Sequence, residues 1–455
     1  MIELLRSPRR LLLFLFEATL LALAVMGAAC IRLGIHEALV APHLRKKAVL
    51  FAFVVAGAAY YTGLYDRAGV RGGASVAKRW LTSALVATPI LLAVFYLVPP
   101  LALGRGIFLA SVALTVTVLP AWRVVYDTVS RNVVTPKRVL VLGTGELALE
   151  IRDHLAMHPE TGDACLGLLA PDRSYVDAIA GVVGTYGELF ELVRALEIET
   201  VVVAFRNRRG TLPVKQLLEL KLRGIECLEG TDYYEGLAGK LFVRELKASQ
   251  IVFAEGYRID RTQRRLKRLF DVIVATIGLV LAAPLMALVA IAVRLDSPGP
   301  FLYRQERAGE FGKPFVILKF RSMRLDAEKD GARFAADEDP RITRTGNFIR
   351  KTRLDELPQL WNVLVGDMSM VGPRPERPVF LERLEQRIPF FKQRLYVKPG
   401  VTGHAQVRCR YGASTEDMLQ KLQYDLYYIK SQSLLFDLSI LVDTVKVVLL
   451  KIGAR

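Results

Sequence analysis

The chain has 455 residues, of which 52% are hydrophobic, and carries a formal net charge of +17. Its mean hydropathy of +0.30 is high for a soluble protein. An apolar chain that is also strongly basic is typical of a membrane protein with Lys- and Arg-rich cytoplasmic loops. This balance argues against an ordinary soluble protein, and the apolar runs described next argue against nucleic acid as the partner of the positive charge.

Four apolar runs lie early in the sequence, and we expect residues 1–125 to form a four-helix transmembrane region. Each run comes near the roughly 20 residues that a helix needs to cross the hydrocarbon core. With the amino terminus inside, cytoplasmic loops carry more Lys and Arg than the opposite loops, although Arg45-Lys46-Lys47 opposes this bias. Glu17 is the acidic residue within the runs. One acid makes no proton relay, so in place of a transport or proton site we expect it to face the bundle or to lie near an interface. The runs are Leu11–Ile31, Ala48–Leu64, Trp80–Val98 and Ile107–Ala121.

Residues 137–250 alternate between strand and helix patterns, which predicts a Rossmann-like parallel sheet. The sequence Gly143-Thr-Gly145-Glu-Leu-Ala148 follows the first strand and matches a dinucleotide fingerprint. The chain has no Tyr-x-x-x-Lys, which excludes short-chain dehydrogenase and sugar-epimerase chemistry. We therefore favour a regulatory or assembly domain and assign no cofactor-binding residues. Further expected strands are Cys165–Ala170, Thr200–Phe205 and Gly224–Leu228.

The run Val272–Val293 contains no charge and is long enough to span a bilayer. Pro284 lies in its middle, where it removes a helix hydrogen bond and favours a kink. Basic residues flank both ends of the run. A straight fifth span would separate these flanks, whereas a re-entrant helix over about 268–294 would keep them on one face. The residues alone leave both arrangements open.

The charged residues that we expect to carry the chemistry are concentrated in residues 350–375. Asp355 and Glu356 are adjacent carboxylates, and such a pair requires a counter-charge from a divalent cation or from arginines. Arg350 precedes the pair, and a Gly-Pro-Arg-Pro turn presents Arg374. Carboxylates with Arg, and without His or Cys, indicate chemistry on a phosphoryl group. The alternative is a helix with a solvated Asp-Glu pair.

We expect residues 260–455 to form a mostly α catalytic domain that includes the apolar run around Pro284. Tyr303–Gly309 and Phe315–Met323 are predicted to pair as short strands that present cations, and Asp326–Pro340 is predicted to be a polar loop. The tail Leu434–Leu450 is apolar but carries charged residues. It fits an amphipathic helix on the membrane surface or a helix packed in the core.

This carboxyl-terminal region resembles the monotopic polyprenyl-phosphate glycosyl-1-phosphate transferases of the bacterial sugar transferase family. Four spans followed by a Rossmann-like domain resemble the long-form members that initiate exopolysaccharide and O-antigen synthesis. Ala283 stands where many members have Ser, and His404, which we expect to be structural, stands where many have Trp. The matching motifs are Lys267-Arg268-Leu-Phe-Asp271, Lys319-Phe-Arg321-Ser-Met323, Leu354-Asp355-Glu356-Leu-Pro-Gln-Leu-Trp-Asn362, Gly366-Asp367-Met-Ser, Gly372-Pro-Arg374-Pro375 and Lys398-Pro-Gly-Val-Thr-Gly403.

The resemblance implies transfer of a sugar 1-phosphate from a UDP-sugar to polyprenyl (undecaprenyl) phosphate, with release of UMP. Asp355 would be the catalytic nucleophile and form a covalent phosphosugar intermediate, and Glu356 would support the metal or the proton transfer. The implied cofactor is Mg²⁺, held at Asp355 and Glu356. The implied phosphate-binding residues are Arg350, Arg374, Lys319 and Arg321.

Because UDP-sugars are cytoplasmic, the resemblance favours the re-entrant helix and a catalytic domain on the cytoplasmic face of the bacterial inner membrane. It also suggests a homodimer. A non-catalytic membrane scaffold or nucleotide sensor for polysaccharide assembly is the alternative from another class. A scaffold has no use for Asp355 beside Arg350 and Arg374, which argues against it. The motifs bind diphosphate and metal, and they do not specify the sugar.

Overall fold

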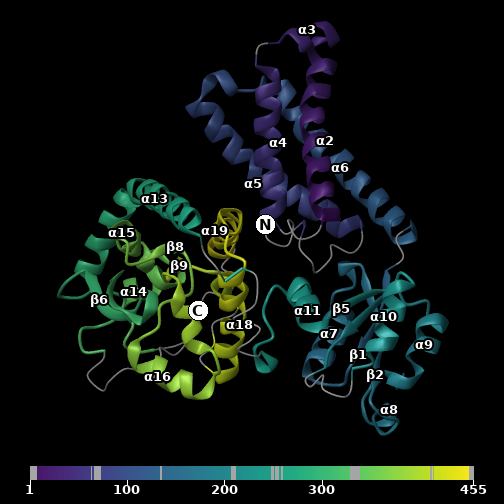
Figure 1. Cartoon of the computed structure of the whole chain (residues 1–455). Helices are drawn as coiled ribbons and strands as arrows, with labels where there is room; N and C mark the ends of the chain where they lie inside the picture. The colour runs from purple at the N-terminus through teal and green to yellow at the C-terminus, as the bar shows by residue number, and fades with distance from the viewer. Residues whose placement is uncertain are drawn as a thin grey trace.

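The computed structural model describes residues 8–41, 43–62, 64–65, 73–133, 136–205, 212–246, 251, 256–257, 260–327, 339–409, 412 and 414–449. Much of the predicted polar loop Asp326–Pro340, and loop cations such as Arg67, Arg71 and Arg258, lie outside these residues. The described chain forms an amino-terminal helical block, a parallel sheet with helices on both faces, and a mostly helical carboxyl-terminal region, as Figure 1 shows.

The amino-terminal block is a bundle of long helices that contains the apolar runs. Its elements are α2 (Pro8–Leu33), the short α3 (Ile35–Val40), α4 (Leu44–Tyr61), α5 (Gly73–Leu97) and α6 (Arg105–Val133). Among the described residues, α2, α5, α6 and the later helix α13 (Arg261–Asp296) are long and apolar enough to cross a membrane. Large apolar side chains such as Leu12, Phe53 and Leu85 are exposed on the bundle, as helices that face lipid require.

Glu17 lies inside this bundle and is fully buried, as expected. Its carboxylate is 2.6 Å from the guanidinium of Arg123 on α6 and accepts a hydrogen bond of 2.5 Å from the hydroxyl of Tyr65. Arg123 also donates to the carbonyl of Leu64 at 3.3 Å. The ion pair therefore joins α2 to α6 and to the segment that follows α4.

The middle region is a parallel sheet with strand order β3-β2-β1-β4-β5, the Rossmann-like arrangement that the sequence predicts. Val139 and Val141 of β1 pack with one layer of helices, whereas Leu140 and Leu142 pack with the other. Strand β3 was not predicted, because it is short and contains Gly184. The elements are β1 (Lys137–Leu142), α7 (Glu146–Met157), β2 (Asp163–Ala170), α8 (Ser174–Ala178), β3 (Val182–Thr185), α9 (Leu189–Ala195), β4 (Thr200–Val203), α10 (Val214–Leu222), β5 (Glu226–Glu229) and α11 (Gly230–Ala238).

The carboxyl-terminal region combines helices with small sheets. The predicted strand pair is confirmed as an antiparallel hairpin of β6 and β7, and β8 pairs with β9 in parallel. Buried side chains such as Val363, Val371 and Leu422 form its core. The elements after α13 are β6 (Leu302–Ala308), β7 (Pro314–Phe320), α14 (Arg344–Lys351), α15 (Gln359–Val365), β8 (Ser369–Val371), α16 (Pro378–Arg387), β9 (Gly400–Thr402), α17 (His404–Arg408), α18 (Thr415–Lys430) and α19 (Leu434–Leu449).

Helix α13 continues on both sides of Pro284. Near its start, Arg268 donates to two carbonyls of α15 at 2.5 and 2.7 Å. Near its end, Val289 and Val293 pack with Phe320 of β7 in one buried cluster. Both halves of α13 therefore lie against the same carboxyl-terminal body (Figure 1).

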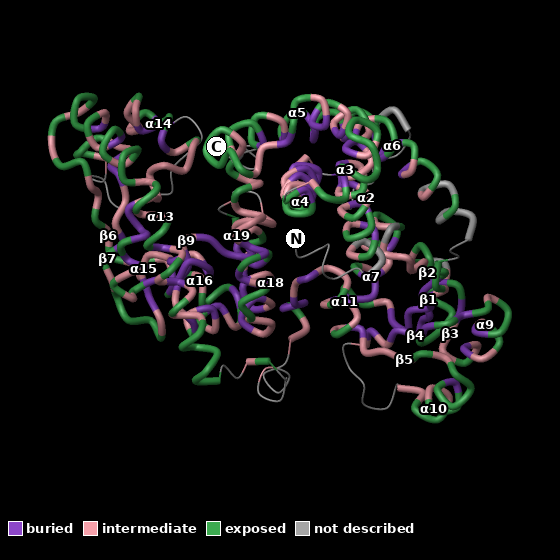
Figure 2. Tube along the Cα trace, turned by 90° about the horizontal axis from the view of Figure 1, so that it is seen from above, coloured by how far each residue is buried: buried purple, intermediate pink, exposed green. Residues whose placement is uncertain are grey.

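The tail forms helix α19, which packs in the core, the second of the two expected placements. Asp437 and Ile440 are fully buried. On another side of α19, the hydroxyl of Tyr61 on α4 donates to the carbonyl of Val442 at 3.2 Å. In Figure 2, α19 lies between α18 and the membrane block, so this helix connects the two parts.

Candidate active site

The Asp355–Glu356 pair lies on a short 3₁₀ turn (Leu354–Glu356) between α14 and α15. The backbone reverses just before it, at Arg353, whose φ of 60° lies in the left-handed region that side-chain-bearing residues rarely adopt. Arg350 and the pair therefore do not lie on one continuous helix. The reversal ends the helix after Arg350, and the carboxylates begin a separate turn that leads into α15.

Glu356 is surrounded by basic groups from separate parts of the chain. Its carboxylate is 2.8 Å from the guanidinium of Arg374, 3.4 Å from the ammonium of Lys319 and 3.8 Å from the guanidinium of Arg353. The Glu356 side chain is only 12% exposed, so these attractions are weakly screened by solvent. The structure thus brings strand β7 and the turn after β8 to the predicted dyad.

The two carboxyl groups of the dyad have pKa values shifted in opposite directions. Burial, and then the neighbouring charge of Glu356, raise the pKa of Asp355 to about 6. Burial alone would also raise the pKa of Glu356, but Arg374, Lys319 and Arg353 hold it well below its ordinary value. Glu356 is therefore a charge-compensated anion at neutral pH. Asp355 is the more basic carboxylate, which makes it the better nucleophile.

Arg350 also belongs to this site. It lies in the last turn of α14, and its positive charge is among those that lower the pKa of Asp355. Three of the predicted phosphate-binding residues, Arg350, Arg374 and Lys319, are thus gathered around the dyad. Arg353 was not among the predicted site residues. Its position two residues before Asp355, as a nearby counter-charge, is the signal that could have found it.

Arg321 has a different environment from the one we expected. Its side chain is buried and donates to the carbonyls of Ser297 and Pro298 at 2.7 and 2.8 Å. These contacts fix the connection between α13 and β6. The structure does not bring Arg321 to the dyad, and we leave it out of the site.

Asn362 explains why Lys319 faces the dyad. Its side-chain amide donates to the carbonyl of Val316 at 2.8 Å, and its side-chain oxygen accepts from the backbone N–H of Leu318 at 3.0 Å. Through this pair of bonds the Asn362 side chain pairs with the backbone of β7 and holds α15 against that strand. The strand register then places Lys319 beside the turn that precedes α15.

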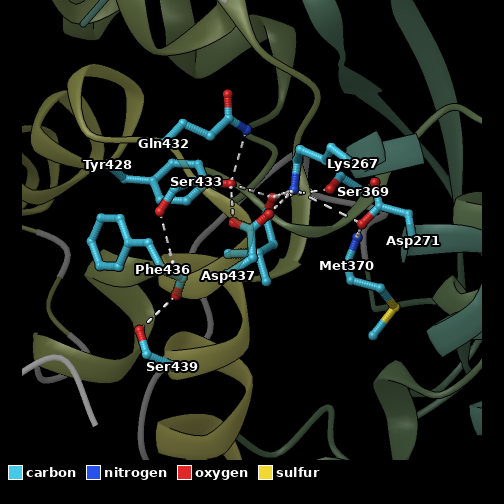
Figure 3. A network of polar contacts seen from close by, with 11 residues as sticks. Lys267, Asp271, Ser369, Met370, Tyr428, Gln432, Ser433, Phe436, Asp437 and Ser439 are labelled. Atoms are coloured by element: carbon cyan, nitrogen blue, oxygen red, sulfur yellow. Dashed lines mark hydrogen bonds and ion pairs between the residues drawn. The ribbon is translucent and has the colours of Figure 1, made fainter. Parts of the chain in front are cut away.

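A buried polar network fixes the start of α13 to the strand that leads into the site (Figure 3). The ammonium of Lys267 lies 2.7 Å from the carboxylate of Asp437 on α19 and donates to the carbonyl of Val371 at 3.2 Å. One turn later, the carboxylate of Asp271 accepts a bond of 3.0 Å from the backbone N–H of Met370. Two residues of α13 therefore hold the backbone of strand β8 in a fixed position relative to this helix.

The glycine loop of the middle region lies between β1 and α7. A Cβ at Gly143, where φ is 135°, would lie 2.4 Å from the carbonyl oxygen of Ala204, so this turn requires glycine. A carboxylate oxygen of Glu245 lies 3.5 Å from the position of a Cβ on Gly145. The acidic side chain of Glu245 therefore lies close to this loop.

His404 has the structural role expected for it. It is buried, and its Nε2 lies 3.0 Å from the carbonyl oxygen of Gly239. Its ring packs against the rings of Tyr424, Tyr427 and Phe436. These contacts fix the start of α17 to α18, α19 and the segment that follows α11.

A buried carboxylate dyad among cations, on a chain with helices long and apolar enough to cross a membrane, is typical of a membrane-associated site for phosphoryl groups. The model of the family described as bacterial sugar transferase matches residues 262–451. A putative undecaprenyl-phosphate N-acetylgalactosaminyl 1-phosphate transferase of Bacillus subtilis is 54% identical over 156 residues, which are 34% of this chain and 83% of that protein. The chain therefore belongs to the bacterial sugar transferase family, and the predicted family and enzyme class are confirmed.

Other relatives extend the similarity. The UDP-N-acetylgalactosamine-undecaprenyl-phosphate N-acetylgalactosaminephosphotransferase of Aeromonas hydrophila is 46% identical over 190 residues, 42% of this chain and 45% of that protein. The UDP-glucose:undecaprenyl-phosphate glucose-1-phosphate transferase of Escherichia coli is 36% identical over 264 residues, 58% of this chain and 57% of that protein. The chain thus matches about half the length of these two relatives.

Proposed function

We propose that this protein transfers a sugar 1-phosphate from a UDP-sugar to undecaprenyl phosphate and releases UMP, as the first membrane step of exopolysaccharide or O-antigen synthesis. The observation that carries the proposal is the dyad, in which Asp355 has a raised pKa beside a charge-compensated Glu356. The names of the relatives from Bacillus subtilis, Aeromonas hydrophila and Escherichia coli all describe transfer to undecaprenyl phosphate.

The reaction proceeds in two displacements at one phosphorus atom. In the first, a carboxylate oxygen of Asp355 attacks the β-phosphorus of the UDP-sugar, the bond to the bridging oxygen breaks, and UMP leaves. In the second, a phosphate oxygen of undecaprenyl phosphate attacks the same phosphorus and frees Asp355. The product is undecaprenyl diphosphate sugar. Splitting the transfer in this way lets one site serve a soluble donor and a lipid acceptor in turn.

The cations around the dyad hold the phosphates. Arg374 and Lys319 already face the carboxylate of Glu356, and the positive charge of Arg350 acts on Asp355. Guanidinium groups bind phosphate oxygens in bidentate fashion and stabilise the charge that develops on them. Glu356 in turn keeps these cations in place before the donor arrives.

The dyad also fits the predicted Mg²⁺. This ion is commonly bound by one or two carboxylates together with substrate phosphates and water, and Asp355 and Glu356 supply the carboxylates. When bound, Mg²⁺ neutralises phosphate charge. Among the described residues no cluster of three or more acidic, His or Cys side chains offers a site built from protein alone.

The catalytic region lies on the cytoplasmic face of the inner membrane, with α13 as a re-entrant helix. The uncharged run Val272–Val293 would extend about 33 Å at 1.5 Å per residue, close to the roughly 30 Å hydrocarbon core, so its length alone permits either arrangement. The contacts of both halves of α13 with one body, at Arg268 and at Val289, support a return to the same face. The basic flanks then stay together on the cytoplasmic side.

UMP release tests the proposal. Purified protein is incubated with Mg²⁺, undecaprenyl phosphate and a panel of UDP-sugars, and UMP and the lipid product are quantified. We expect one or a few donors to yield equal amounts of both. Release of UDP instead of UMP, or no reaction with any donor, would contradict the proposal. A non-catalytic scaffold would give no reaction with any donor.

A further inference from the structure

Arg374 projects from a turn that has few backbone donors, because prolines stand on both sides of it. The backbone of the turn is held through its carbonyls. Next to each end of the turn, a strand provides a donor: Gly400 N–H bonds the carbonyl of Pro373 at 2.9 Å, and Ala308 N–H bonds that of Glu376 at 3.0 Å. These bonds fix the ends of the turn to β9 and β6.

The two carbonyls between these ends are held by arginine side chains. Arg394 donates to the carbonyl of Arg374 at 3.1 Å. Arg307 donates to the carbonyl of Pro375 at 3.1 Å. Four consecutive carbonyls are therefore bonded from outside the turn, and the side chain of Arg374 is left to reach Glu356 at 2.8 Å.

Arg394 is itself held by acidic groups. Its side chain is 4% exposed and lies 2.7 Å from Asp425 of α18, whose side chain is 2% exposed. It also lies 3.5 Å from Glu376 and packs over the ring of Phe391 at 5.0 Å. Buried ion pairs are weak contributors to net stability because of their desolvation cost, but breaking one leaves an uncompensated buried charge. This chain of contacts links α18 to the active site.

We propose that Arg394 and Arg307 are positioning residues that hold Arg374 in place against Glu356 through the two carbonyls of the turn, and that Asp425 fixes Arg394. The proposal rests on the function proposed above, in which Arg374 binds the donor phosphates. Arg394 and Arg307 act through the backbone and touch no reacting atom.

The test is a double-mutant cycle on the full chain with the UDP-sugar that gives UMP release. Arg394→Lys keeps a positive charge opposite Asp425. It loses the planar guanidinium, which contacts Asp425 and the carbonyl of Arg374 simultaneously. We expect kcat/KM for the UDP-sugar to fall about 10- to 100-fold, mainly through KM, because a misplacement of about 1 Å can cost about 100-fold. KM for undecaprenyl phosphate should stay close to wild type. Tm should fall modestly, because a buried carbonyl of the turn loses its donor. Arg307→Lys should behave in the same way.

Non-additivity is the decisive readout. In an Arg374→Lys background, which keeps a charge for residual activity, Arg394→Lys should cause little further loss. The matched control is Lys392→Gln, which removes an exposed ion pair with Glu385 close to Arg394 and should leave all parameters unchanged. Wild-type kinetics for Arg394→Lys, or losses that multiply in the double variant, would overturn the proposal. Absence of UMP release by the wild type would instead refute the proposed function itself.

Discussion

Asp355 and Glu356 occupy consecutive positions of one 3₁₀ turn, yet their carboxyl groups have pKa values shifted in opposite directions. The difference arises because Arg374, Lys319 and Arg353 all lie within 4 Å of Glu356. The cations thus keep one carboxylate ionised and leave its neighbour more basic than an ordinary aspartate. Two chemically similar side chains acquire separate roles through their surroundings.

The first prediction concerns pH. Asp355 attacks as a carboxylate, so kcat/KM should fall about tenfold per pH unit once the pH drops below the pKa of this group. With the pKa raised to about 6, the decline should begin near that pH. Initial rates of UMP release across an acidic pH series check this, with the exposed Glu382→Gln as a control. A decline that begins near the ordinary aspartate value would contradict it.

The same shift has a consequence for stability. A carboxyl group with a raised pKa in the folded state binds its proton more tightly there than in the unfolded chain. Its stabilising contribution is present at low pH and is lost as pH rises through about 6. Asp355→Asn imitates the protonated form and should therefore have a higher Tm than the wild type at pH above neutral, together with lost activity. A lower Tm for this variant would show that the ionised group is stabilising.

The second prediction separates Arg321 from the phosphate site. Arg321→Met removes the donors to the carbonyls of Ser297 and Pro298, and each unsatisfied buried group costs about 1–3 kcal/mol. Tm should fall, while KM for the UDP-sugar of the folded enzyme should not change. Arg324→Met, at a nearby exposed position, is the control. A raised KM at wild-type Tm would return Arg321 to the phosphate-binding residues.

The third prediction concerns the buried ion pair of the membrane block. Glu17→Gln leaves the guanidinium of Arg123 buried without its counter-charge, a change that typically costs about 3–5 kcal/mol. The protein should lose thermal stability in detergent, and the double variant with Arg123→Gln should recover part of it. Lys78→Gln, at an exposed position on α5, should have no effect. Equal stability of all variants would show that the pair contributes nothing.

The fourth prediction concerns the path of α13. In a chain whose four cysteines are replaced, single cysteines at Asp260 and Pro300 should react with a membrane-impermeant maleimide from the same side of the vesicle. The reason is that both halves of α13 contact one carboxyl-terminal body. Labelling in inside-out and right-side-out vesicles makes the measurement. Reaction from opposite sides would mean that α13 is a straight span.

Much of the architecture was predictable because it depends on composition and periodicity. The apolar runs predicted the long helices of the amino-terminal block, and the alternation after Lys137 predicted the parallel sheet. Motif residues such as Asp355 and Lys319 were found because their spacing carries chemical meaning. The site residues that were predicted wrongly or missed depend on local backbone geometry, which residue type alone does not reveal.

Arg321 and Arg353 illustrate this limit. Lys319 and Arg321 are two residues apart and would share one face of a strand, but β7 ends at Phe320 and Arg321 leaves the sheet. Arg353 adopts a left-handed conformation that arginine does not favour, so nothing in the residue types marked the end of the helix there. Arg394 lies far from the dyad in sequence and outside every motif, so only the folded chain shows its contact with the Arg374 turn.

The covalent intermediate is the central claim of this account, and intact-protein mass spectrometry after rapid quenching tests it most directly. Enzyme mixed with Mg²⁺ and the UDP-sugar, without undecaprenyl phosphate, should gain the mass of one sugar phosphate and release one equivalent of UMP. Peptide analysis should place the adduct on Asp355, and Asp355→Asn should show neither adduct nor UMP. UMP release only when donor and lipid are both present, with no adduct at any quench time, would contradict the account.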